Sequence, residues 1–147
     1  MPPTTSGFAG VGRVTIEPVT ASFTSAFTPP FTFASTLTGL TLGKTGNASA
    51  VTINSAISIA GPIRVFGGDV TISANVSTSG VDQPIVFQAI SNVLQNASRT
   101  IQTNGGDIVY WSNSTAQTTG NRGILISDSS TLDTCLLYTS DAADDLT

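Results

Sequence analysis

The sequence predicts an all-β protein, a parallel β-solenoid. Three observations point to it: a composition rich in Ser, Thr, Asn and Gly, an apolar fraction dominated by Ile and Val, and internal repetition. Ser, Thr, Asn and Gly supply 63 of the 147 residues, and only 10% of residues are charged. Such a chain lacks both good helix formers and the charged residues that cover a helix. Ile and Val favour the half-buried surface of a sheet, and the length fits one domain.

Residues 1–36 are expected to form an irregular or extended lead-in to the repeats. Four phenylalanines stand there among Thr, Ser and Pro, at positions 23, 27, 31 and 33. Because Phe side chains mostly lie inside proteins, we expect a buried cap or a packed linker. A ligand-binding aromatic strip is the alternative.

Residues 37–134 are expected to form the solenoid. In the stretch 51–59, Val and Ile alternate with small or polar residues, which indicates half-buried strands. The sequence VTIN at 51–54 recurs as VTIS at 70–73, a shift of 19, and Gly-Gly-Asp at 67–69 recurs at 105–107, a shift of 38. These shifts predict turns of about 19 residues, too short to bury an apolar face without stacking on neighbouring turns.

Stacking at about 4.8 Å per turn gives roughly five turns and a rod of about 24 Å. The rival architecture is a β-sandwich of antiparallel hairpins, which the spacing of the strands also allows. Sandwiches do not usually repeat in sequence at a fixed spacing, so the solenoid is preferred.

Residues 135–147 look like a translated sequencing-library adapter. The run from Cys135 to Asp144 is spelled by the codons TGT CTC TTA TAC ACA TCT GAC GCT GCC GAC, which resemble the transposon-end adapter of shotgun libraries. We expect a non-native, disordered tail and exclude it from the fold; a genuine amphipathic tail is the alternative. Without the tail, acids fall from 9 to 6 against 5 bases, so the net charge changes from −4 to −1. The acidic balance therefore implies nothing about partners.

The composition excludes several kinds of site. The chain has no His, which rules out Ser-His-Asp and Cys-His triads and His-ligated metals, and we expect no cofactor. No stretch approaches about 18 apolar residues, so no membrane span is expected. The first residues also lack the features of a signal peptide. Nucleic-acid binding is not expected, because the basic residues are scattered: Arg13, Lys44, Arg64, Arg99 and Arg122.

The two Gly-Gly-Asp motifs are candidate sites. A shift of 38 would place Asp69 and Asp107 on one side of the rod two turns apart, at about 9.6 Å, which is in the range of a water-using glycosidase pair. Turn chemistry is the preferred interpretation, with Asp bonding nearby backbone and Gly at positive φ. On this interpretation six residues have a structural role in turns: Gly67, Gly68, Asp69, Gly105, Gly106 and Asp107. A Ca²⁺ role is a weaker alternative, because no second carboxylate completes six to eight oxygens.

Trp111 is the candidate glycan contact. If Ile108 and Tyr110 face inward, then Val109 and Trp111 face outward. An exposed indole on a flat sheet can stack on the apolar face of a sugar ring. Burial of Trp111 under a loop or a neighbouring module is the preferred interpretation, and the glycan contact is the alternative.

The segments 40–42, 51–57, 67–72, 101–111 and 123–126 together resemble very large, repetitive secreted adhesins of bacteria, similar to filamentous haemagglutinin. The resemblance covers roughly residues 41–128 and implies a right-handed parallel β-helix in an exported surface stalk. It also implies host or environmental glycans or proteins, and adjoining repeats of the same chain, as partners.

We therefore expect a structural, adhesive stalk segment that is secreted or held at the cell surface and has no catalysis of its own. The alternatives are a carbohydrate-binding module and a β-helical polysaccharide-degrading enzyme. The enzyme would require a cluster of charged side chains around Asp69, Asp107 and Arg64. Exposed terminal turns would leave unpaired strand edges, so we expect the isolated chain to aggregate or dimerise.

Overall fold

The computed structural model describes residues 7–116 and 122–134; the tail expected at 135–147 lies outside the described residues. The described residues form strands and no helix. The strands are β1 (Gly7–Phe8), β2 (Gly12–Ile16), β3 (Thr32–Phe33), β4 (Leu37–Leu42), β5 (Val51–Ile53), β6 (Ile57–Ile59), β7 (Ile63–Gly67), β8 (Val70–Ile72), β9 (Val76–Val81), β10 (Ile85–Ala89), β11 (Val93–Gln95), β12 (Thr100–Asn104), β13 (Ile108–Trp111), β14 (Ile124–Ile126) and β15 (Thr131–Asp133).

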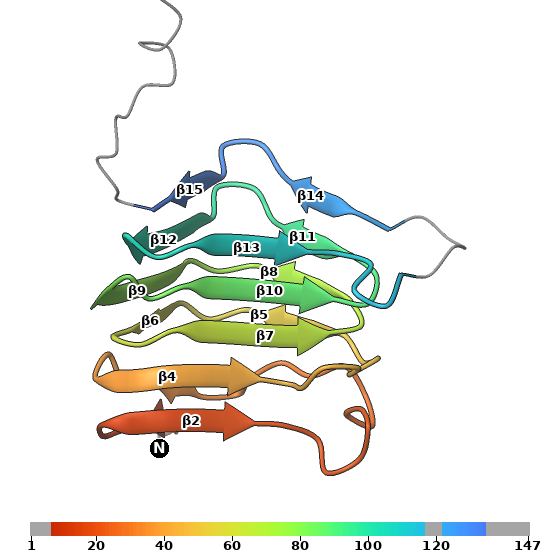
Figure 1. Cartoon of the computed structure of the whole chain (residues 1–147), viewed down its shortest axis with the longest axis horizontal. Coiled ribbons are helices and arrows are strands. Elements are labelled where there is room, and N and C mark those ends of the chain that lie inside the picture. Colours follow the sequence, from red (N-terminus) through yellow and green to blue (C-terminus); the bar gives the residue numbers. More distant parts are fainter. Residues whose placement is uncertain (1–6, 117–121, 135–147) are drawn as a thin grey trace, which may run out of the picture.

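Three parallel sheets form the sides of the molecule. Sheet I has the order β13-β10-β7-β4-β2, sheet II the order β14-β11-β8-β5 and sheet III the order β15-β12-β9-β6. Each full turn of the chain visits sheets I, II and III once and then rises to the next level (Figure 1). The predicted all-β parallel solenoid of about five turns is therefore confirmed.

The coil is right-handed. In Figure 1 the near strands of sheet I point to the right, and the chain returns behind them to the left while it rises from red to blue. This is the hand that a right-twisted strand and its crossover favour in parallel sheets.

The turns are longer than the repetition predicted. Paired strands lie about 23 residues apart, as for Ile85 and Ile108 in sheet I, whereas the 19-residue shift holds only for the pairs β5–β8 and β6–β9. The corners between the sheets explain the difference, because their lengths vary from turn to turn. The chain takes 11 residues from Leu40 to Val51 and 7 from Ile63 to the equivalent Val70.

The solenoid also begins earlier than residue 37. The strand β2 pairs with β4, Phe27 forms a parallel bridge with Val51, and β3 pairs with β1, so residues 12–33 form most of a turn. Three of the four phenylalanines of this segment pack as expected for a cap: Phe23, Phe27 and Phe33 lie against the core, and the rings of Phe23 and Phe27 stack with centroids 4.4 Å apart. Phe31 instead packs edge-on against Phe8 and Phe33. Residues 12–33 of the expected lead-in are thus part of the coil.

Inward side chains form continuous rows along the axis. One row of sheet II consists of Val51, Val70 and Val93, each fully buried, with Ile124 above them. Another row, in sheet I, consists of Leu42, Val65, Phe87 and Tyr110. Each fully buried aliphatic side chain contributes about 1.5–3 kcal/mol. The few such side chains in one turn do not offset the entropy lost on ordering it, so the turns are stable only when they stack together.

Candidate functional site

Trp111 lies on the outer face of sheet I, as the alternation predicted. Its side chain is 51% exposed and that of Val109 is 37% exposed, while Tyr110 packs inward with its ring edge against Phe87 at 5.3 Å. The register aligns Trp111 with Gln88 on β10 and Gln88 with Phe66 on β7. The sequence did not indicate this row, because the corners differ in length and the register between strands cannot be read from the sequence.

A second outward row runs beside the first on the same three strands. It consists of Arg64, which is exposed, and the aligned Val86 and Val109. We call the two rows together the sheet I strip, which comprises Arg64, Phe66, Val86, Gln88, Val109 and Trp111. The strip is a small, flat surface that combines two aromatic rings, an amide and a guanidinium.

The structure does not bring Asp69 and Asp107 onto one side of the rod. Asp69 precedes β8 at the corner between sheets I and II, whereas Asp107 precedes β13 at the corner between sheets III and I. Residues 38 positions apart in the two motifs therefore lie at different corners. The expectation that Asp69 and Asp107 form a pair two turns apart on one side of the rod is wrong. The Asp69 carboxylate instead accepts hydrogen bonds from the backbone N and the side-chain Nδ2 of Asn92, both at 3.0 Å.

In the Gly-Gly-Asp motifs, glycine is required mainly where the backbones of two turns approach closely, and at only one position for a positive φ. Gly105 has a positive φ of 87°, as turn chemistry predicted, and Gly68 does not. At Gly68 an added Cβ would lie 2.1 Å from the carbonyl oxygen of Ala48 in the turn below. The corner thus allows no side chain at that position.

A polar cluster inside the upper part of the core was not predicted. Gln95 occupies a core position above Ile72 and is 1% exposed. Its Oε1 accepts a hydrogen bond from the Tyr110 hydroxyl, and its Nε2 donates to the Arg99 carbonyl oxygen at 2.7 Å. The only feature of the sequence that indicated this cluster was a polar residue, Gln95, at the end of the otherwise apolar stretch 93–95. Its bonds satisfy the buried amide, so the cluster fixes the packing of this turn.

Burial raises the pKa of the Tyr110 hydroxyl well above its ordinary value of 10.0. The folded state therefore keeps this proton at pH values where the unfolded chain loses it, so the free energy of unfolding should fall as pH rises above about 10. Urea unfolding between pH 8 and pH 11 should show this fall in the wild type and a smaller fall in Tyr110→Phe. Equal slopes in the two proteins would contradict the assignment.

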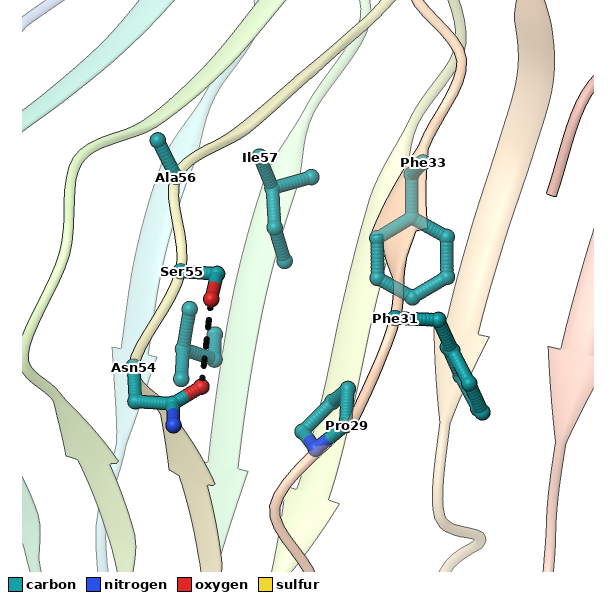
Figure 2. Close-up of a pocket in the computed structure, with 8 residues that line it drawn as sticks. Pro29, Phe31, Phe33, Asn54, Ser55, Ala56 and Ile57 are labelled. Atoms are coloured by element: carbon teal, nitrogen blue, oxygen red, sulfur yellow. Dashed lines mark hydrogen bonds between the residues drawn. The ribbon is translucent and has the colours of Figure 1, made fainter. Parts of the chain in front are cut away.

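The cavity beside the Phe31–Phe33 segment is too small to enclose a ligand. Figure 2 shows a cavity between the Phe31–Phe33 segment and the corner at residues 53–57, with a volume of about 10 Å³. That is room for about one water molecule. A larger depression of about 320 Å³ is open to solvent on the outer face of sheet II and includes Leu94, Arg122 and Leu125.

Within residues 7–116 and 122–134, no three His, Cys, Asp or Glu side chains lie close enough together to hold a metal ion. The same residues include no helix long and apolar enough to cross a membrane.

Comparisons of the chain with protein-family models, with curated proteins and with solved structures find no significant match.

Proposed function

We propose that this chain is a structural stalk segment of a large secreted or cell-surface bacterial protein, with no catalysis of its own. The observation that carries the proposal is the open upper end of the coil. Ile124 and Leu132 are 47% and 46% exposed, whereas the residues aligned with them one turn below, Val93 and Ile101, are fully buried. The last turn thus exposes the rows that every lower turn covers with the next one.

The unpaired strands support the same role. Each of the three sheets ends in a strand of this last turn, β13, β14 or β15, whose outer edge has no partner strand among the described residues. Parallel edges of this kind pair readily with another strand. A further turn of solenoid would satisfy the backbone groups and bury the apolar rows together, as expected within a longer stack that resembles the repetitive adhesins.

A polysaccharide-degrading enzyme is the second candidate and is less well supported. Acid–base cleavage of a glycosidic bond needs two carboxyl groups facing one bond. Asp69 and Asp107 stand at different corners, and Arg64 lies on the outer face of sheet I. Release of reducing or unsaturated sugar ends from a polysaccharide, lost in Asp69→Asn or Asp107→Asn, would overturn the stalk proposal in favour of the enzyme.

Sedimentation velocity tests the open end directly. We expect the chain to associate with increasing concentration, and the double variant Ile124→Lys/Leu132→Lys to stay monomeric, because charges on an edge strand oppose pairing. Val19→Lys is the matched control, since Val19 is fully exposed far from this end. A wild-type chain that stays monomeric at all concentrations would show that the end is closed and would contradict the proposal.

A further inference from the structure

We propose that the sheet I strip binds a linear β-linked polysaccharide, with Phe66 and Trp111 as stacking platforms and Gln88 and Arg64 as hydrogen-bonding groups. The strip lies on the outer face of sheet I, and its uppermost strand, β13, is also the last strand of this sheet at the open end. Its side chains point away from the face of the sheet and not along the axis, so binding there does not use the strand edge that a further turn would cover.

The first argument is that neither ring contacts another aromatic ring within residues 7–116 and 122–134. Seven of the nine aromatic side chains in the described residues contact another ring: Phe8, Phe23, Phe27, Phe31, Phe33, Phe87 and Tyr110. The remaining two are Phe66 and Trp111, and the register places both in one outward row. An exposed indole and a partly exposed phenyl ring in one row are an apolar surface that the fold covers only in part.

The spacing of the rings fits a chain of sugars. Phe66 and Trp111 are two strands apart, so their backbones are separated by about 9.6 Å along the rod. This is comparable to the length of a disaccharide unit in an extended β-linked chain, whose alternate rings could stack on the two side chains. A flat sheet suits a straight polysaccharide and not a strongly curved one.

Polar groups within the strip favour a sugar over a second protein. Gln88 lies between the two rings and Arg64 beside Phe66, and neither side chain makes a hydrogen bond or ion pair within the described residues. A dry protein interface would bury both without partners, at a cost of about 1–3 kcal/mol for each such group. Sugar hydroxyls can accept from the guanidinium and both donate to and accept from the amide.

The other two outer faces lack this combination. The corresponding row of sheet III consists of Ser58, Ser77, Gln102 and Asp133, and that of sheet II consists of Thr52, Thr71, Leu94 and Leu125. Neither row contains an aromatic ring. The strip is therefore a local feature of sheet I and not a general property of the coil surface.

Tryptophan fluorescence provides a direct test, because Trp111 is the only tryptophan in the chain. Titration with cellohexaose, a straight β-linked chain, should shift the emission to shorter wavelength and reach saturation. Maltohexaose, which has the same sugars in a curved α-linked chain, should give little change. The titration is run on the Ile124→Lys/Leu132→Lys variant as well, so that association at the open end is separated from binding.

Phe66→Ala keeps the reporter and should weaken cellohexaose binding by roughly three- to tenfold, the loss expected for one stacking ring. Gln88→Ala should weaken it as well. Leu125→Ala, an exposed apolar residue on sheet II, is the matched control and should bind like the wild type.

Three results would overturn the proposal. The first is no saturable emission change with cellohexaose, and the second is an equal response to maltohexaose. The third is an emission shift that follows protein concentration without sugar and is lost in Phe66→Ala, because it would assign the strip to contact between two copies of the chain. Circular dichroism establishes that each variant is folded, so a negative result counts against the site.

Discussion

Replacement of Phe87 by alanine is expected to lower the free energy of unfolding by about 3–5 kcal/mol, the range for removing a fully buried phenyl ring. Phe87 is 0% exposed and is among the largest buried side chains of the core. Its ring supports Tyr110, whose hydroxyl donates to the buried Gln95 amide. The cavity would therefore weaken both an apolar row and the polar cluster above it. Urea unfolding followed by circular dichroism measures the change.

Phe66→Ala is the matched control for Phe87→Ala. Phe66 is the same residue type on the adjacent strand, but it faces outward and is only half-buried. Its loss should cost about 1 kcal/mol, because less apolar surface returns to water and no internal cavity forms. Similar losses for the two variants would mean that β7 and β10 do not have the predicted inward and outward faces.

Gly68→Ala is expected to destabilise the fold by about 3 kcal/mol or more, which is at or above the usual cost of overpacking. The new methyl carbon would lie 2.1 Å from the carbonyl oxygen of Ala48. That oxygen cannot easily retreat, because the buried Asn47 ties its loop to the next turn through a 3.0 Å hydrogen bond from Nδ2 to the Phe66 carbonyl. The two turns must therefore separate at this corner.

Gly123→Ala provides the comparison for Gly68→Ala. No atom lies within 4 Å of an added Cβ at Gly123. Its backbone N–H still donates to the Asn92 side chain at 2.9 Å, and alanine keeps that donor. Thermal unfolding of this variant should resemble that of the wild type. If Gly68→Ala also unfolded like the wild type, the stacking role of the motif would be refuted.

The alternation of residue types predicted the strands and their faces well. In residues 51–59 the Val and Ile side chains are buried, and the small or polar residues between them are more exposed. The outward position of Trp111 followed from the same period of two. These features depend on neighbouring residues within one strand, which a sequence displays directly.

The placement of strands relative to one another could not be predicted in the same way. Two occurrences of Gly-Gly-Asp looked equivalent, but close stacking of backbones recurs at several corners, as at Gly68 and Gly106. The corners also differ in length. The row that joins Phe66, Gln88 and Trp111 depends on the sum of those lengths, so only the folded chain reveals it.

Each strand pairs only with strands about one turn away along the chain. In the described residues, no pair of strands joins positions more than 31 residues apart. The entropy lost on closing one turn is therefore nearly the same for every turn and does not grow with the length of the stack. Folding can begin at one end and advance turn by turn. A chain that emerges gradually from a ribosome would pass through intermediates that already have a closed core and a single growing edge.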